Sequence, residues 1–307
     1  MTAKLRRLMR LAAVLISTIT LAACGASLAR TDAAELDGVE AARAEAAIAS
    51  IEDQVGGRLG VALLSGEVGM ILRHREAERF AMCSTFKAPL GAAVLAEVEA
   101  GRLRLKESIA ISRNDLVPHA PAVEQRLDAG EVSMPLDALI AAAMQASDNS
   151  AANLLLRRIG GPEGFTRFVR ERGNTVTRLD RLEPELNENR PGDPRDTTSP
   201  EAMARLMREV LLGNALHEGS RAMLIQNMTA TETGLRRIRA GLPEGWLAGD
   251  KTGTCGSAYN DVSIFWDDLG MPYLLSVYLD RPSVQSVEAE AALAAVARVA
   301  SDYVRTR

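Results

Sequence analysis

The sequence predicts a mixed α/β (α+β) fold in which both ends of the chain build one sheet-containing lobe and an all-helical lobe is inserted between them. Strand patterns lie near the two ends of the 307-residue chain, and helical patterns fill the stretch between them. With 47% hydrophobic and 25% charged residues, the composition is that of a globular protein large enough to bury a substantial core.

The N-terminal part of the chain predicts a helix followed by a hairpin. Residues 35–54 are rich in Ala and Glu and have the composition of a helix. Residues 58–64 and 69–75 predict two short strands, with the turn-forming segment Ser65-Gly66-Glu67 between them. Such a hairpin would supply the first strands of the sheet.

The segment Ser84–Ala100 predicts a helix that is buried on nearly all sides. Ala, Val and Leu recur around it, and Gly101 follows as a helix-ending residue. Pro89 opposes this prediction, because a proline inside a helix removes one backbone hydrogen bond and crowds the preceding turn. The helix is therefore expected to begin close to Ser84 or to be distorted near it.

Helices predominate in the middle of the chain, and strands return near its end. Helical patterns occur over residues 136–146, 147–159, 162–172 and 199–212. Strand patterns follow over residues 246–254, 260–266 and 273–279, and the amphipathic segment 284–305 predicts a final helix on the sheet. The long loop over residues 181–198 contains three prolines, and a loop of this length in a compact domain is usually functional or disordered.

The first 23 residues have the pattern of an export signal. Four basic residues precede the apolar run Leu11–Ala23, whose thirteen residues are too few for a stable membrane span. Leu21-Ala22-Ala23-Cys24 is similar to a bacterial lipobox, in which Cys24 would be lipidated and become the mature N-terminus; ordinary cleavage within residues 22–27 is the alternative. We expect a periplasmic protein with residues 24–34 as a tether, anchored to the outer membrane if Cys24 is lipidated.

The net charge disfavours one class of binding partner, and the number of cysteines indicates a possible disulfide. Loss of residues 1–23 changes the formal net charge from −4 to about −8, which disfavours nucleic acid as a partner. If Cys24 carries lipid, Cys83 and Cys255 remain as a pair in an oxidising compartment, where disulfides persist. Two reduced, buried cysteines are the alternative.

Three short motifs follow one another along the chain: Ser84-Thr85-Phe86-Lys87, Ser147-Asp148-Asn149 and Lys251-Thr252-Gly253. A serine hydroxyl is a weak nucleophile at neutral pH, so an enzyme that uses it needs a base beside it and positive charge near the developing oxyanion. The motifs contain such groups. A single Ser-x-x-Lys arises often by chance on a helix surface, whereas three motifs in this order predict acyl transfer at a serine.

Together with one loop segment, the motifs resemble those of class A serine β-lactamases over essentially the whole mature chain. Arg181-Leu182-Glu183-Pro184-Glu185-Leu186-Asn187 is similar to the Ω loop of that family and differs mainly at Leu182, where an aromatic residue is common. The resemblance implies the fold shared with penicillin-binding proteins: an antiparallel sheet flanked by the N- and C-terminal helices, with an all-helical lobe inserted. The α/β lobe would span about 35–80 and 230–307, and the helical lobe about 81–229.

Catalytic roles follow from the resemblance. Ser84 would be the nucleophile, and Lys87 would accept its proton or act electrostatically; whether Lys87 or Glu183 is the acylation base stays open. Ser147 would relay a proton to the leaving lactam nitrogen. Glu183 and Asn187 would hold the water that hydrolyses the acyl-enzyme.

Judged alone, Glu183 would be one solvated loop carboxylate among several. Its setting favours a function, because Arg181 and Asp196 bracket the loop and, by resemblance, pair to close it. An exposed ion pair contributes little, so this pair is expected to be partly buried. A penicillin-binding protein lacks the placed carboxylate and water and stays acylated, so Glu183 and Asn187 favour turnover.

The resemblance also implies a substrate-binding set. It consists of His119, Asn149, Asn187, Arg237, Lys251, Thr252, Gly253 and Thr254. The backbone amides of Ser84 and Thr254 would form the oxyanion hole, and Gly253 would let its strand approach the substrate closely. For Arg237, the alternative is a solvated basic patch; for His119, it is a plain surface histidine.

Resemblance to one subgroup of the family implies that this protein hydrolyses carbapenems. Cys83 and Cys255 match the disulfide of class A enzymes that hydrolyse carbapenems, and Thr254 and Arg237 agree with that subgroup. One departure is the segment 256–259, which is shorter than usual after the third motif and would leave the pocket more open on that side.

Two other functions stay open. One is a penicillin-binding DD-carboxypeptidase or transpeptidase that acts on peptidoglycan stems, and the other is a non-catalytic envelope lipoprotein. His74 and His217 show no metal-ligand spacing, so neither a metal nor another cofactor is expected. The family suggests a monomer with a small β-lactam as its substrate.

Overall fold

A five-stranded antiparallel sheet, with the strand order β2-β1-β9-β8-β7, forms the centre of the molecule. The computed structural model describes residues 38–307, so the predicted signal, Cys24 and the tether lie outside the described residues. The strands are β1 (Arg58–Ser65), β2 (Gly69–His74), β7 (Ala248–Cys255), β8 (Ala258–Trp266) and β9 (Pro272–Asp280). Since β1 pairs with β9 along its whole length, both ends of the chain build one sheet, which confirms the predicted fold class.

Side chains of the sheet alternate between two hydrophobic clusters. In β1, Leu59, Val61 and Leu63 belong to the cluster formed with the terminal helices, whereas Ala62 and Leu64 belong to the cluster formed with the helical lobe. Successive residues of a strand point to opposite faces, so both faces of this sheet are buried. That double burial explains the continuous apolar runs in β1 and β9.

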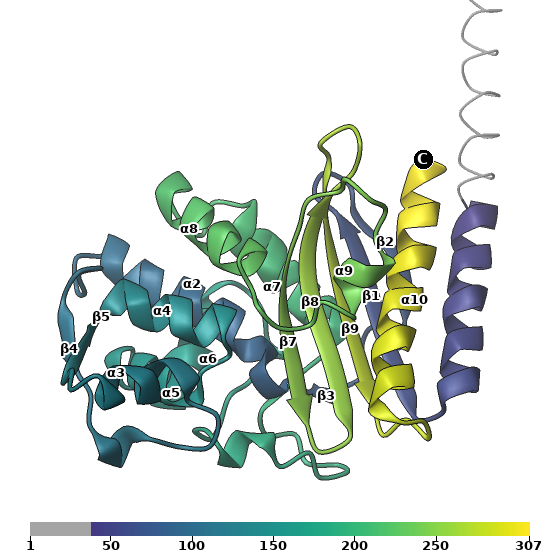
Figure 1. Cartoon of the computed structure of the whole chain (residues 1–307). Helices are drawn as coiled ribbons and strands as arrows, with labels where there is room; N and C mark the ends of the chain where they lie inside the picture. The colour runs from purple at the N-terminus through teal and green to yellow at the C-terminus, as the bar shows by residue number, and fades with distance from the viewer. Residues whose placement is uncertain (1–37) are drawn as a thin grey trace, which may run out of the picture.

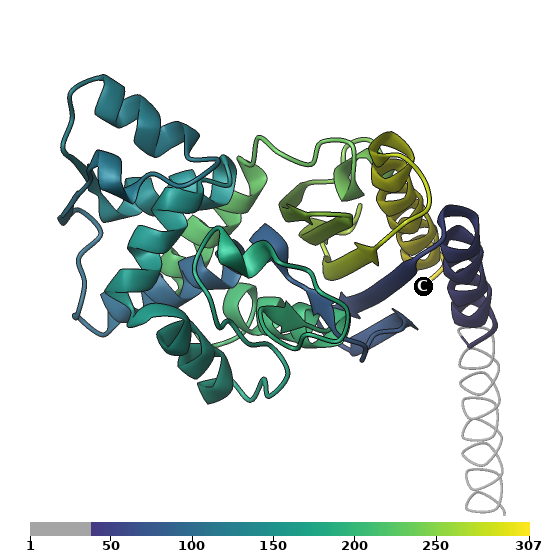
Figure 2. The same cartoon turned by 90° about the horizontal axis from the view of Figure 1, so that it is seen from below.

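Two terminal helices cover one face of the sheet. The helix over residues 38–55 and α10 (Ser286–Arg305) lie side by side there (Figures 1 and 2). The buried residues of α10 include Ala289, Leu293, Val296 and Ala300, whose three- and four-residue spacing puts them on one face of the helix. No helix within residues 38–307 has both the length and the hydropathy that crossing a bilayer requires.

The helical lobe covers the opposite face and supplies most of the larger hydrophobic cluster (Figure 1). Its helices are α2 (Lys87–Glu99), α3 (Pro121–Asp128), α4 (Leu136–Gln145), α5 (Asn149–Arg158), α6 (Gly161–Glu171), α7 (Pro200–Leu211) and α8 (Glu218–Thr229). Shorter elements are η1 (Cys83–Phe86), η2 (Arg113–Asp115), η3 (Glu185–Asn187), α9 (Ile238–Gly241) and the strand pairs β3 (Phe80–Ala81) with β6 (Thr197–Thr198) and β4 (Ser108–Ala110) with β5 (Ser133–Pro135). α7 packs directly against β1 and β9.

The start of α2 resolves the conflict around Pro89. Cys83–Phe86 form a 3-10 turn, and the α-helix begins only at Lys87. Pro89 is therefore in the first turn, where backbone N–H groups have no partner within the helix. The expected helix start close to Ser84 is confirmed, and Ser84 itself lies in the tight turn.

Candidate active site

Ser84 lies in η1, where the chain enters α2. The preceding residue, Cys83, is buried and has a positive φ of 47°, a conformation that residues with a side chain seldom adopt. Ser84 is half-buried, and its hydroxyl makes no hydrogen bond to another group within residues 38–307. In this turn, the Ser84 hydroxyl is therefore not tied to another side chain or backbone group of residues 38–307.

Lys87 follows Ser84 by one turn and is fully buried. Its ammonium donates to the Ser147 backbone oxygen at 2.7 Å and to Asn149 Oδ1 at 2.5 Å, and it lies 3.2 Å from Glu183 Oε1. Burial lowers the pKa of Lys87, and the charge of Glu183 opposes that shift. The amine therefore joins the first motif to the second motif and to the long loop.

The second motif forms the junction between α4 and α5. Ser147 has a positive φ of 57°, and its Oγ accepts from Lys251 Nζ at 3.1 Å and from Lys87 Nζ at 3.4 Å. Asn149 accepts from Lys87 and donates one Nδ2 hydrogen to Pro118 O at 2.7 Å. Because an amide nitrogen carries two hydrogens, one remains for another acceptor.

Lys251 and Gly253 lie on β7, beside the turn that holds Ser84. Lys251 is fully buried, and this burial, together with the charge of Lys87, lowers its pKa to about 7. A Cβ added to Gly253 would lie 2.6 Å from Met82 O and 3.1 Å from Ser84 N. Gly253 therefore permits β7 to lie close to the backbone around Ser84, in addition to the predicted close approach of β7 to substrate.

Arg237 is 5% exposed, so it does not belong to a solvated basic patch. Its guanidinium donates to Thr254 Oγ1 at 2.7 Å and to Asn260 O at 2.8 Å, and it lies 3.2 Å from Glu290 Oε1. Thr254 itself is exposed at the end of β7. The buried arginine thus holds the hydroxyl of an exposed threonine.

Two further predicted residues lie at the edges of this group. Thr252 Oγ1 lies 2.9 Å from Thr233 Oγ1, so the two hydroxyls share a hydrogen bond. His119 is exposed, and its ring Nε2 lies 3.1 Å from Ala146 O. The backbone N of Asn149 donates to His119 O at 2.9 Å, which ties the histidine to the second motif.

Glu183 is 2% exposed and is held by two asparagines. Asn187 Nδ2 donates to Glu183 Oε2 at 2.5 Å. Asn153 binds the backbone: its Oδ1 accepts from Glu183 N at 2.9 Å and its Nδ2 donates to Glu183 O at 2.8 Å. Asn153 was not predicted from the sequence, although its position one helical turn after Asn149 was an available signal.

The neck of the long loop is closed by Arg181 and Asp196. Arg181 Nε donates to Asp196 Oδ2 at 2.6 Å, and the two side chains are 15% and 1% exposed. Asp196 Oδ1 also accepts from the backbone N of Asp180 at 2.7 Å. The prediction of a partly buried pair is confirmed.

A buried pair of carboxylates behind Lys251 was not predicted. Asp250 accepts from Arg239, and Asp261 Oδ2 accepts from the backbone N of Ile238 at 3.1 Å. Burial raises the pKa of both carboxyls, and the charge of Asp250 adds to the rise at Asp261. Only the register of β7 with β8 brings them together, and the sequence did not specify that register.

Cys83 and Cys255 form a disulfide, with their Cα atoms 5.7 Å apart. The alternative of two reduced cysteines is therefore wrong. Both residues are buried and pack with Ala258 in a small cluster. The bond joins η1, which carries Ser84, to the end of β7.

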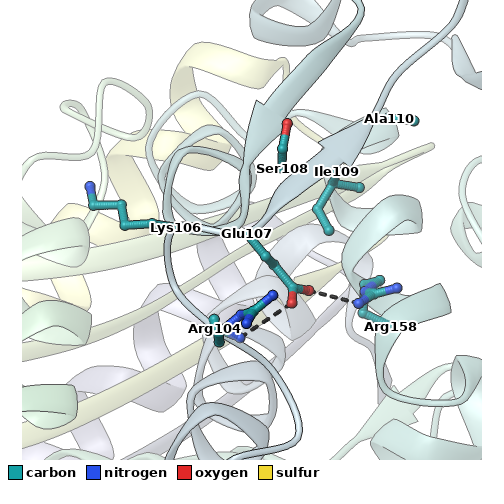
Figure 3. A pocket seen from close by; sticks show the side chains of 7 residues that line it. All are labelled: Arg104, Lys106, Glu107, Ser108, Ile109, Ala110 and Arg158. Carbon is teal, nitrogen blue, oxygen red and sulfur yellow. Dashed lines mark hydrogen bonds and ion pairs between the residues drawn. The ribbon is translucent and has the colours of Figure 1, made fainter.

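A cavity of about 610 Å³ lies away from these residues, at β4 and the end of α5 (Figure 3). It is lined by Arg104, Lys106, Glu107, Ser108, Ile109, Ala110 and Arg158. Glu107 points between Arg104 and Arg158 and pairs with Arg158 at 2.7 Å, whereas Lys106 points away (Figure 3). None of the lining residues belongs to a motif or to the long loop, so this cavity is separate from the candidate active site.

The motifs and the long loop meet where β7 faces the helical lobe. Lys87 and Lys251 both reach Ser147, Glu183 reaches Lys87, and Gly253 lies against the turn of Ser84. A two-lobed fold with this convergence is the arrangement of the penicillin-recognising enzymes, which form acyl esters on a serine.

Comparison with known proteins narrows this class. The chain belongs to the class A serine β-lactamases, and a sequence model of the β-lactamase enzyme family matches residues 43–304. It is 41% identical to β-lactamase CTX-M-8 of Citrobacter amalonaticus over 83% of this chain and 87% of that protein. It is 42% identical to the carbapenem-hydrolyzing β-lactamase KPC of Klebsiella oxytoca over 82% and 86%, respectively.

Solved structures agree with the sequence comparison. A β-lactamase from Xanthomonas campestris pv. campestris superposes with a TM-score of 0.83 at 46% identity, covering 85% of this chain and 97% of that one. An ancestral class A β-lactamase (GNCA) gives a TM-score of 0.82 at 46% identity over 84% and 99%. The fold and the hydrolase class are thereby established.

Proposed function

We propose that this β-lactamase opens its substrates by acylating Ser84 and releases the product with a water held by Glu183 and Asn187. One observation carries the proposal: Asn187 Oδ1 is buried and accepts no hydrogen bond within residues 38–307, and Glu183 Oε1 is buried with only the ion pair to Lys87, at 3.2 Å, as its contact. The two residues are themselves hydrogen-bonded through Asn187 Nδ2. A water needs two acceptors for its hydrogens, and this pair supplies them while leaving a lone pair for attack.

In the acylation step, Ser84 Oγ attacks the lactam carbonyl and its proton passes either to Lys87 in its neutral form or to Glu183. The lactam C–N bond then breaks, and Ser147 delivers a proton to the nitrogen. The position of Ser147 Oγ, 3.4 Å from Lys87 Nζ and 3.1 Å from Lys251 Nζ, supports this relay. In deacylation, Glu183 takes a proton from the water, whose oxygen attacks the ester carbonyl. The bond to Ser84 Oγ then breaks, and the proton returns from Glu183 to Ser84 Oγ, which restores the free enzyme.

Substrate binding is proposed for the remaining residues of the site. Lys251, with Thr252 or Thr254, binds the substrate carboxylate, and the backbone amides of Ser84 and Thr254 receive the oxyanion. Arg237 orients Thr254 through its hydrogen bond. Asn149 donates its remaining amide hydrogen to the substrate side chain, and His119 borders the entrance.

Two variants test the mechanism with a chromogenic cephalosporin. Ser84→Ala is expected to abolish hydrolysis and to form no covalent adduct, because it lacks the nucleophilic oxygen. Glu183→Gln is expected to form the adduct, detected by mass spectrometry of the intact protein, and to release it at least about 100-fold more slowly. Normal turnover by Glu183→Gln would remove Glu183 from the proposed role.

Carbapenems are included in the proposed substrate range. The disulfide between Cys83 and Cys255, the Arg237–Thr254 hydrogen bond and the similarity to KPC support this proposal. Purified protein is expected to hydrolyse imipenem with repeated turnover. A stable imipenem adduct with no product release would exclude a carbapenemase.

Export and anchoring are proposed from the sequence. The N-terminal signal supports a periplasmic enzyme that Cys24 anchors to the outer membrane through lipid, and the family supports a monomer. Mass spectrometry of the mature N-terminus should find a lipidated Cys24. A Cys24→Ser variant should lose the lipid, and an unmodified N-terminus beyond residue 24 in the original protein would contradict the anchor.

A further inference from the structure

The tip of the long loop is attached to the sheet by a side-chain hydrogen bond. Asn189 Nδ2 donates to Asp280 Oδ1 at 2.6 Å. Asp280 is the last residue of β9, and its side chain is 5% exposed. The contact is therefore a hydrogen bond from a loop amide to a buried carboxylate of the sheet, which is stronger than one between neutral groups.

The same carboxylate lies beside the turn that follows β7. Arg58 and Arg281 each approach Asp280 Oδ2 at 3.2 Å, which leaves Oδ1 for Asn189. The backbone N of Arg281 donates to Ser257 O at 3.0 Å, and Ser257 lies in the short turn between β7 and β8. The tip of the loop and the turn after β7 thus meet at the same end of β9.

Apolar packing does not hold this part of the loop. Leu186 in η3 is buried, but residues 187–195 contribute no side chain to the hydrophobic core. A cavity of about 430 Å³ lies between residues 189–194 of the loop and a group of side chains that includes Arg58, Arg79 and Arg281. Arg281 Nη2 also donates to the backbone O of Asn189, but at 3.5 Å, so the 2.6 Å bond from the Asn189 side chain is the shorter of the two restraints on the tip.

We propose that Asn189 is a positioning residue for deacylation, because its bond to Asp280 keeps Glu183 and Asn187 where they can hold the hydrolytic water. This proposal rests on the proposed function of Glu183. The backbone N of Asn189 donates to Asn187 O at 2.9 Å, and Asn187 in turn donates to Glu183, so a displaced tip disturbs Glu183 through a single intervening residue. A misplacement near 1 Å can cost about 100-fold in rate.

The first test is Asn189→Ala in the mature enzyme with a chromogenic cephalosporin. Decay of the acyl-enzyme, followed by quenching and mass spectrometry, is expected to slow about tenfold, since the water is held less well. kcat and KM should fall together, while kcat/KM, which reports acylation, should change by less than about threefold. Glu185→Ala is the matched control: Glu185 is exposed on the same loop, its side chain makes no hydrogen bond within residues 38–307, and deacylation should be unchanged.

A reversed pair separates positioning from general damage. N189D alone places two carboxylates together and should slow deacylation more than N189A. Adding D280N exchanges donor and acceptor, and the double variant should recover deacylation to within about threefold of the original enzyme. Unchanged deacylation in N189A, or an equal loss of kcat/KM with a lower melting temperature, would overturn the positioning role.

Failure of this proposal can be told from failure of the proposed function. If Glu183→Gln accumulates the acyl-enzyme and Asn189→Ala does not, the positioning role is wrong and the role of Glu183 stands. If Glu183→Gln turns over normally, both proposals are overturned, since Asn189 acts only through Glu183.

Discussion

Lys251 is fully buried in the ligand-free enzyme. Burial lowers the pKa of folded Lys251 to about 7 from an ordinary 10.5, so between these values the unfolded chain binds more protons than the folded enzyme. The free energy of unfolding of the ligand-free enzyme should therefore rise with pH from about 7 to about 10 and lose this contribution as the pH falls through 7. Denaturant unfolding at several pH values checks the sign, and Lys251→Met should reduce the slope.

A direct titration of Lys251 tests the lowered pKa without the contributions that other ionisable groups make to the pH dependence of stability. The side chain of Lys251, followed by NMR with Lys251→Met for assignment, should change charge near pH 7. A midpoint above about 9.5 would contradict the proposed effect of burial and of Lys87.

Substitution of Gly253 tests whether activity requires the close approach of β7 to Ser84. Gly253→Ala would bring a Cβ within 2.6 Å of Met82 O and 3.0 Å of Thr85 N, and these are backbone atoms that cannot rotate away. Separation of the strand from the turn should lower kcat/KM for a penicillin by at least about 100-fold. Gly219→Ala on α8 meets no atom within 4 Å and should leave activity unchanged; similar activity in both variants would show that the close approach is not required.

At the scale of single residues, the sequence indicated what the motifs contain but not what surrounds them. The motif residues and Glu183 were selected from sequence because their types and order are restrictive. Asn153 and Asp261 were missed because their importance comes from contacts with residues distant in sequence, Glu183 in one case and the β7 segment in the other. Arg237 was ambiguous for the same reason, since only the packed strands show that it is buried.

Among the elements, α3 and α5 share one capping residue. Asp148 is fully buried and caps α5 through Ala151 N at 2.8 Å, while its other oxygen accepts from Ala122 N and Val123 N of α3 at 2.9 and 3.0 Å. Asp148→Ala leaves three N–H groups without this acceptor and should lower the free energy of unfolding by about 3 kcal/mol.

A surface aspartate provides the comparison for Asp148. Asp137, in the first turn of α4, pairs with the exposed Lys106 at 2.5 Å, so Asp137→Ala should cost less than about 1 kcal/mol. Denaturant unfolding measures both variants. If both variants lose the same free energy of unfolding, Asp148 acts as an ordinary cap of one helix and does not stabilise the contact between α3 and α5.

The elements differ in how well the sequence predicted them. β9 and α10 were located to within two residues because both bury many side chains in a regular pattern. No helix was predicted at α3 or α8, and these helices bury only Val123 in the first case and Leu224, Asn227 and Met228 in the second. With so few buried positions, their periodicity is too weak to distinguish a helix from a loop. The three-residue strands β4 and β5 are shorter than any pattern can reveal.

At the scale of the whole molecule, the disulfide connects two lobes that are also joined by a shared core. Cys83 and Cys255 are 172 residues apart in sequence, so the bond removes much conformational freedom from the unfolded chain. Replacing both cysteines by alanine should lower the free energy of unfolding by about 3 to 5 kcal/mol. Cys24→Ser, which leaves the bond intact, is the control, and a loss below about 1 kcal/mol in the double variant would contradict this account.

The pairing of β1 with β9 has a consequence for how the enzyme is made. Only the β1–β2 hairpin can form early, and an isolated hairpin is marginally stable in water. The strand that pairs with the other edge of β1 is β9, at 272–280, and β2 ends far earlier, at His74. Until synthesis is nearly complete, β1 lacks β9, its second partner in the sheet. Pairings between strands so distant in sequence form slowly. A precursor that is exported before it folds would benefit from this late closure, because its sheet stays incomplete for as long as β9 is missing.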